Sequence, residues 1–242
     1  MTRRILLLAP LASLACSSAS TPPQTPAEAT TPAEAAPAAA PAAAAPAPVG
    51  AATCTNAVLE DLEDGDAKST DADGRGGYWF TYKDSAGSTV APEGQFAPAS
   101  GGANGSKSAA HMSGKTGSGG TVYVGMGFNL ADPMAPYDLS KAKAVCFSAK
   151  GKGSARVKLP DLNTIPEGGV CKSCYNDFGA DFALTDDWKE HCFEFSALKQ
   201  QSGWGEPKPA PALDHVYQMQ WQISSPGIDY DLWVDEIKLK CE

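Results

Sequence analysis

The chain has 242 residues and a formal net charge of −9, with 19 lysine and arginine residues against 28 aspartate and glutamate residues. No basic cluster stands out in the sequence, so nucleic acid is excluded as the expected partner. The 24 glycines and 19 prolines favour a chain of turns and short strands over one of long helices.

Residues 1–15 have the features of a signal peptide. Arg3 and Arg4 supply a positive start, and the apolar run at 5–14 is too short to span a bilayer as a helix. The small residue before Cys16 resembles a bacterial lipobox, which implies that Cys16 becomes the acylated first residue. An ordinary signal peptide cut nearby, with Cys16 incidental, is the alternative. We therefore expect an exported protein, lipid-anchored to a bacterial membrane, at the outer membrane or the cell surface.

Residues 16–53 are almost entirely Ala, Pro, Ser, Thr and Glu. Such a segment buries too little apolar surface to offset the entropy of ordering it, and its prolines oppose a helix. We expect a disordered, extended tether that holds one domain, residues 54–242, away from the membrane. The lipid anchor would be the only membrane contact, and the protein is expected to be a monomer.

Apart from Cys16, six cysteines remain, an even number that favours disulfides in an exported chain. Cys54 and Cys241 bracket the domain, so we predict a bond between its first and last strands. Either Cys171 bonds to Cys174 and Cys146 to Cys192, or the loop with Cys171 and Cys174 is joined at both ends to the strands that carry the other two. Zinc would suit one set by residue type: Cys171, Cys174, Cys192 and His191.

The aromatic stretch GRGGYWFTYKD occupies residues 74–84. Alternation places Tyr78, Phe80 and Tyr82 on one face and Trp79 on the other, beside Thr81 and Lys83. Because Thr and Lys mark a solvent-facing side, three of the four rings are predicted to lie in the core. Only Trp79 would be free to act outside it.

Alternation of apolar and polar residues, the period of a β-strand, recurs along the rest of the chain. It occurs at 121–128, 143–150, 155–160, 191–196, 217–224 and 231–241. In the last segment, Trp233, Asp235, Ile237 and Leu239 are predicted to share one face. About eight or nine strands with one apolar face each predict an all-β, two-sheet antiparallel β-sandwich, best fitted by a jelly roll.

Five motifs follow one another in an order that resembles the galactose-binding-like jelly rolls, which include many carbohydrate-binding modules of glycoside hydrolases. They are LEDLEDGD at 59–66, GYWFTY at 77–82, YDLSKAKAVCFSAKG at 137–151, Trp188 before HCFEFSAL, and DLWVDEIKL at 231–239. The stretches TIPEGGVCKSCYNDFG and QQSGWGEP do not belong to that general pattern.

This resemblance implies a structural calcium ion that ties the first strand to the last, with Glu63 and Asp235 as its side-chain ligands. Hard cations take oxygen ligands in this way. Asp235 is expected to be buried because it shares a face with apolar residues, and a buried carboxylate requires a cation or several hydrogen bonds. Solvated acidic turns around one hydrogen-bonded carboxylate are the alternative.

The polar faces of the predicted strands supply the candidate ligand site. Arg156, Gln220 and Gln222 offer planar hydrogen-bonding groups, and Lys158, Ser148 and Glu194 also fall on these polar faces. Tyr123 is expected to stack on a sugar over an open floor left by Gly125 and Gly127, and Tyr175 and Trp204 on nearby loops would form walls. Outward sheet faces are polar in any case, which is the alternative explanation.

Signals for catalysis are weak. The sequence has neither a GxSxG nor an HExxH motif, and its three histidines, His111, His191 and His215, are scattered. We expect non-catalytic binding of a polysaccharide or cell-wall glycan. A cell-surface structural or protein-interaction module without a sugar site is one alternative, and a glycan-processing enzyme with paired carboxylates is another.

Overall fold

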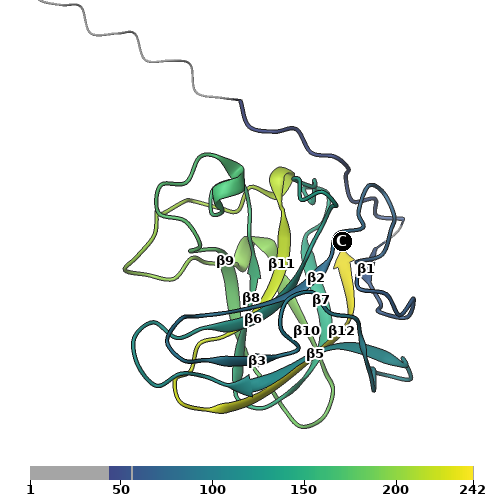
Figure 1. Cartoon of the computed structure of the whole chain (residues 1–242). Coiled ribbons are helices and arrows are strands. Elements are labelled where there is room, and N and C mark those ends of the chain that lie inside the picture. Colours follow the sequence, from purple (N-terminus) through teal and green to yellow (C-terminus); the bar gives the residue numbers. More distant parts are fainter. Residues whose placement is uncertain (1–43, 56, 242) are drawn as a thin grey trace, which may run out of the picture. The chain divides into compact units, whose positions relative to one another are not determined.

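The computed structural model describes residues 44–55 and 57–241, and there the chain is all-β apart from three single turns of 3₁₀ helix at 166–168, 195–197 and 213–215. Two antiparallel sheets form a sandwich (Figure 1), which confirms the predicted fold class. The predicted signal peptide, Cys16 and most of the tether lie outside the described residues. No helix in the described part is long and apolar enough to cross a bilayer.

A seven-stranded sheet forms one layer, with its main path in the order β10-β7-β12-β5-β3, β1 beside β12 and β4 beside β5. Its strands are β1 (Val58–Glu60), β3 (Thr89–Ala91), β4 (Ala99–Ser100), β5 (Ser108–Lys115), β7 (Ala144–Gly151), β10 (Lys189–Glu194) and β12 (Asp229–Lys240).

A five-stranded sheet forms the other layer, in the order β2-β6-β11-β8-β9. Its strands are β2 (Trp79–Lys83), β6 (Val124–Asn129), β8 (Ser154–Leu159), β9 (Phe178–Ala183) and β11 (Gln218–Ile223). Their order in space places β11 at the centre, which positions its side chains for the site described below.

The core lies between the two sheets and contains the apolar sides of the alternating strands. Trp79 and Trp221 stack with ring centroids 5.9 Å apart. Phe147, which belongs to the opposite sheet, meets the Trp221 ring edge-on, with ring centroids 5.3 Å apart. Aromatic contacts of this geometry add to the stabilisation that burial of these large side chains supplies. The apolar faces predicted for 121–128, 143–150 and 217–224 are the buried ones.

The prediction for the aromatic stretch at β2 is wrong. Trp79 is fully buried, while Phe80 and Tyr82 lie on the outer face of the five-stranded sheet. Thr81 shares the inward face with Trp79, and its hydroxyl donates a hydrogen bond to the carbonyl of Pro92 at 2.8 Å. This bond satisfies the hydroxyl inside the protein, so Thr81 can be buried. Its presence therefore did not identify the solvent-facing side of β2.

The predicted face of the last strand is also wrong over its first half. Leu232 and Val234 are buried, and Trp233 points outward. A β-bulge follows, because three steps along β12 from Asp235 to Lys238 match two steps along β7. Glu236 in the bulge has a φ of +50°. The extra residue returns the inward side to Ile237, so a strict period of two could not describe the whole strand. Asp235 itself is fully buried, as predicted.

The six cysteines form three disulfides, which resolves the predicted alternatives. Cys54 bonds to Cys241, as predicted, and Cys146 bonds to Cys192 across directly paired positions of β7 and β10. Cys171 bonds to Cys174 within one loop. With these thiols oxidised, the zinc alternative is excluded, because thiolates are what zinc requires.

Residues just before the predicted domain boundary at residue 54 contact the domain. The amide of Val49 donates to the carbonyl of Pro136 at 2.9 Å, and that of Ala52 donates to Asp138 at 2.8 Å. Ala52 is fully buried. These contacts attach the end of the predicted tether to the side of the domain.

Candidate functional site

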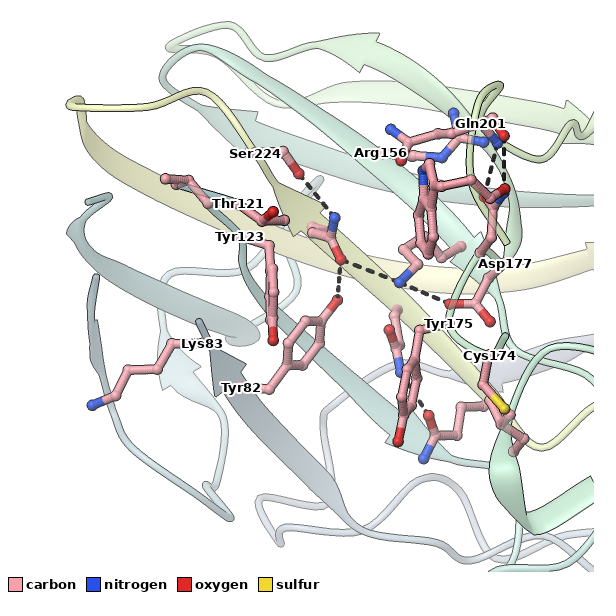
Figure 2. A pocket seen from close by; sticks show the side chains of 18 of the residues that line it. Tyr82, Lys83, Thr121, Tyr123, Arg156, Cys174, Tyr175, Asp177, Gln201 and Ser224 are labelled. Atoms are coloured by element: carbon pink, nitrogen blue, oxygen red, sulfur yellow. Dashed lines mark hydrogen bonds and ion pairs between the residues drawn. The ribbon is translucent and has the colours of Figure 1, made fainter. Parts of the chain in front are cut away.

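A groove with a volume of about 670 Å³ crosses the outer face of the five-stranded sheet. Strands β2, β8 and β11 supply its floor, and the loops around 165–177 and 201–204 supply its walls (Figure 2). The lining contains all six side chains predicted as ligand contacts, namely Tyr123, Arg156, Tyr175, Trp204, Gln220 and Gln222. Two other residues of the predicted polar face, Ser148 and Glu194, lie on the seven-stranded sheet instead.

Three glutamines form the central row of the floor because alternate residues of β11 point to one side of the sheet. The Gln220 side-chain amide donates to Gln218 Oε1 at 2.6 Å, and Gln218 donates to Asn129 Oδ1 at 2.8 Å. Gln222 donates to the Ser224 hydroxyl at 2.8 Å. These bonds fix the orientation of the planar amides, so the floor presents donors and acceptors at set positions.

A buried ion pair lies beside this row. Lys158 Nζ is 2.7 Å from Asp177 Oδ2, and both side chains are almost inaccessible to solvent. Lys158 also donates to Gln222 Oε1 at 3.1 Å, and the Tyr82 hydroxyl donates to the same oxygen at 3.3 Å. Figure 2 shows this chain of contacts running from Tyr82 to Asp177. Burial raises the pKa of Tyr82 well above its usual value, so its hydroxyl remains a donor.

The predicted open floor over two glycines of β6 is not present. A Cβ atom on Gly125 would lie 2.3 Å from the Tyr82 ring, and one on Gly127 would lie 2.8 Å from the Gln220 side chain. The glycines therefore allow these two side chains to lie flat across the strand. Tyr123 packs near Tyr82, with ring centroids 6.3 Å apart, rather than over bare backbone.

The wall formed by the 165–177 loop carries Tyr175 in an unusual backbone conformation. Its φ is +76°, a left-handed conformation that is rare for a residue with a bulky side chain. The Cys171–Cys174 disulfide precedes it, and its amide donates to the carbonyl of Thr164 at 2.6 Å. This local bracing places the ring in the groove lining although the side chain is 61% exposed.

Asn176 joins that wall to the loop that carries Trp204. Its buried amide donates to the carbonyls of Gln201 and Trp204 at 2.8 and 2.7 Å, and it accepts the amide of Gln201 at 2.9 Å. Gly205, with a φ of +73°, packs so close that a Cβ atom there would lie 2.5 Å from that of Asn176. The two walls therefore form one hydrogen-bonded unit.

The exposed aromatic side chains of the described part gather at this groove. Tyr123, Tyr175 and Trp204 are 36%, 61% and 47% exposed, and all three line it. Exposed aromatic rings that gather in one place often mark a binding surface. A concave polar floor between such rings is typical of a ligand site.

Several further lining residues that carry the site were not predicted as part of it. They include Phe80, Tyr82, Asn176 and Asp177. Phe80 and Tyr82 were missed because the sequence pattern assigned both rings to the core face of β2. Asp177 and Asn176 lie in the CYNDFG segment, directly before the apolar residue that opens β9, and only the fold shows that this segment turns over the groove.

The two predicted metal ligands lie around the loop at 101–108. Asp235 Oδ2 accepts the amide of Ala103 at 2.7 Å, and Oδ1 accepts the amide of Glu236 at 2.7 Å. Burial raises the pKa of Asp235. The carboxylate is thus both buried and hydrogen-bonded to backbone, as the alternative to a metal site requires.

Glu63 reaches the same loop from the other side. One of its oxygens accepts the Ser106 hydroxyl at 2.8 Å and the amides of Lys107 and Ser108 at 2.8 and 2.9 Å. No group of three or more acidic, histidine or cysteine side chains surrounds one point in the described residues. Ca²⁺ would fit here only with carbonyl, hydroxyl and water oxygens beside these two carboxylates.

No protein-family model matches the chain, and no curated protein sequence matches it. Among solved structures, it is similar to the family 11 carbohydrate-binding module of the cellulosomal cellulase Lic26A-Cel5E of Clostridium thermocellum. The TM-score is 0.55 at 18% identity, over 76% of this chain and 94% of that one.

A second similar structure is the family 11 module from Clostridium thermocellum in complex with a β-1,3-1,4-mixed-linked tetrasaccharide. The TM-score is 0.50 at 19% identity, over 67% of this chain and 88% of that one. At this identity the likeness concerns the fold. The chain therefore has the jelly-roll fold of carbohydrate-binding modules, which confirms the resemblance drawn from the order of its motifs.

Proposed function

We propose that the protein binds a polysaccharide or cell-wall glycan in the groove of the five-stranded sheet, without catalysis. The observation that supports this most directly is the combination of three exposed aromatic rings with a floor of fixed planar amides. Sugar rings present C–H faces that pack on aromatic rings and hydroxyl groups that pair with amide and ammonium groups. The module solved with a mixed-linked tetrasaccharide, which shares the fold, gives further support.

Glycoside hydrolysis would require two carboxyl groups flanking the ligand, one of them free to donate a proton. The groove is lined by two carboxylates, Glu167 and Asp177. Asp177 is paired with Lys158 at 2.7 Å, so one of its oxygens is already bound within the protein. This pairing favours binding over proton transfer.

The test is a glycan array probed with the full chain, prepared with its disulfides formed. Tyr175→Ala and Gln220→Ala are expected to weaken binding roughly tenfold, about 1.4 kcal/mol each, because each removes a contact in the groove. Lys189→Ala on the opposite sheet is the control and should bind like the original protein. Failure of every glycan to bind would favour a protein-interaction module of the cell surface.

We also propose that the protein is exported and lipid-anchored through Cys16, as its first sixteen residues suggest. Expression in a bacterium with labelled palmitate should label the original chain and leave Cys16→Ala unlabelled. Labelling of neither protein would contradict lipidation. Light scattering of the chain is expected to give the mass of a monomer.

Calcium at the Glu63 and Asp235 carboxylates is proposed as a structural ion only. The proposal is supported by the contacts of both carboxylates with the 101–108 loop, through Ser106, Lys107 and Ser108 for Glu63 and through Ala103 for Asp235. Calcium should raise the melting temperature of the original protein and leave that of Asp235→Asn unchanged. An equal response of the two proteins would remove the ion from this site.

A further inference from the structure

A second hollow of about 560 Å³ lies next to the groove. Three residues line both spaces, namely Asn176, Gln201 and Trp204. Because Trp204 lines both spaces and is 47% exposed, its indole forms a ridge between the groove and the hollow. The hollow is built largely from the segment 199–209, which contains the stretch that did not fit the general pattern of the family.

The ridge is held in place from below. The amide of Asn176 donates to the carbonyl of Trp204 at 2.7 Å, and Gln200 donates to the carbonyls of Asn176 and Glu206 at 2.7 and 3.2 Å. Gln200 also accepts the amide of Lys208 at 2.7 Å. A fixed indole between two concave spaces is suited to stacking on a ligand that crosses it, since little further ordering is required on binding.

The hollow offers hydrogen-bond donors on an apolar rim. Lys199 and Lys208 line it, whereas no carboxylate does, and Pro207 and Pro209 add C–H surface. The ammonium of Lys199 contacts only the carbonyl of Ser196, at 3.4 Å, among the described residues. That of Lys208 lies 3.7 Å from Glu206, too long for a strong hydrogen bond. Both ammonium groups therefore retain donors for oxygen atoms of a ligand.

The two spaces follow one line across the sheet. The groove extends from β2 over β11 to β8, and the segment at Lys199 continues it beyond β9, because Gly179 of β9 bridges to Lys199. Neighbouring strands are about 4.8 Å apart, so the four steps from β2 to β9 alone span roughly 19 Å. That distance is longer than one sugar ring and suits a chain.

We infer that the hollow is a second subsite for the same glycan chain, which lies across the strands, stacks on Trp204 and extends an acceptor oxygen to Lys199 and Lys208. This inference rests on the proposed function, since it extends the groove. The subsite would recognise hydroxyl or carboxylate oxygens of a sugar unit beyond the groove. Binding should therefore depend on chain length, and the lysines should matter only for long chains.

The experiment uses the full chain and an array of neutral and uronic-acid-containing oligosaccharides of graded length, from two to about eight sugars. For a glycan that binds, the original protein should bind the longest chains at least tenfold more tightly than the shortest. The double variant Lys199→Ala/Lys208→Ala should lose that gain and keep its affinity for short chains. Lys189→Ala/Lys240→Ala on the other sheet makes the same change in charge and is the matched control.

Equal losses for short and long chains, or no loss in the Lys199→Ala/Lys208→Ala variant, would overturn the subsite and leave the groove intact as a binding site. Absence of binding to every glycan would overturn the proposed function, and the subsite with it. Salt distinguishes the two oxygen types, since the lysine-dependent gain falls with salt for a carboxylate and changes little for a hydroxyl. Either result supports the subsite. Unchanged melting temperatures would confirm that the lysine variants fold.

Discussion

The outer faces of the two sheets both carry aromatic rings and cations, but only one face leaves the rings free. On the seven-stranded sheet, Trp233 stacks on His111 with centroids 3.8 Å apart, and the Lys150 ammonium lies 4.9 Å from Trp233 and 4.8 Å from Trp188. Asp231 holds His111 at 2.7 Å. The rings, the cation and the carboxylate of this cluster interact with one another. The cluster therefore stabilises the sheet and leaves no ring face open for a ligand.

On the five-stranded sheet, Phe80, Tyr82 and Tyr123 also lie close to one another, but the two rings on the groove walls differ from them. Among the described residues, Tyr175 and Trp204 make no ring-to-ring or cation contact, although both are exposed. The charges below them are neutralised instead, through Lys158 and Asp177. The number of aromatic side chains on a surface therefore does not distinguish a binding face from a stabilising one. Aromatic rings with free faces over a fixed polar floor do indicate a ligand site.

The largest effect is expected where the groove floor is buried. Lys158→Ala leaves the Asp177 carboxylate buried without a countercharge and should lower the free energy of unfolding by about 3–5 kcal/mol. Chemical denaturation measures this. On the opposite sheet, Lys150→Ala removes a partly exposed cation and should lower it by less than about 1 kcal/mol.

A second substitution tests the reason for that loss. Asp177→Asn added to Lys158→Ala should recover part of the lost stability, because no charge is then left buried. An unrecovered loss would show that packing, rather than charge, makes Lys158 important.

Buried carboxyl groups in both regions make stability depend on pH. Burial raises the pKa of Glu60, the last residue of β1 in the seven-stranded sheet, to about 7 and that of Asp161, just before the 165–177 loop, to about 6. Between the unfolded values near 4 and these values, the folded protein binds more protons than the unfolded chain. Each of the two groups should therefore lower the free energy of unfolding by roughly 2–3 kcal/mol as pH rises from about 4 to about 7.

Denaturation at several pH values separates the two contributions. Glu60→Gln should flatten the decline at its neutral end, and Asp161→Asn should flatten it at lower pH. A free energy of unfolding that rises over this window in the original protein would contradict the assignment of both groups.

Two of the disulfides differ widely in the length of chain that they close. The Cys171–Cys174 bond spans a sequence separation of 3 and the Cys54–Cys241 bond one of 187. Loop-closure entropy gives about 2 kcal/mol for the first and about 5 kcal/mol for the second. Cys171→Ser/Cys174→Ser should therefore leave the protein folded but weaken glycan binding severalfold, since Tyr175 loses its bracing.

Chemical denaturation and glycan titration on that double variant measure the two effects. Cys54→Ser/Cys241→Ser, the control, should be much less stable. Unchanged glycan affinity in the Cys171→Ser/Cys174→Ser variant would show that the loop positions Tyr175 without its disulfide.

Much of the fold could be predicted from the sequence because most strands here have one buried face. The alternation at 217–224 predicted both the core side and the glutamine row of β11. It failed at Thr81, whose hydroxyl is bonded inside the sandwich, and at Asp235, where a bulge shifts the strand by one residue. A threonine bonded to a distant carbonyl and a bulge both depend on tertiary contacts, which a period of two does not contain.

The candidate site was predictable in its strand residues and less so in its loops. Arg156, Gln220 and Gln222 follow from alternation once the strands are assigned. The pairing of Asp177 with Lys158, and the support of Trp204 by Asn176, join positions 19 or more residues apart through irregular backbone. Their side-chain types alone do not indicate such contacts.

Under the proposed function, rings with free faces bind glycan, while rings stacked on one another stabilise the sheet. The most direct test measures glycan affinity and the free energy of unfolding for Trp204→Ala and Trp233→Ala. Trp204→Ala should bind about tenfold more weakly with stability within about 0.5 kcal/mol of the original. Trp233→Ala should lose about 1–3 kcal/mol of stability and bind normally. Equal effects of the two substitutions on binding would contradict the account.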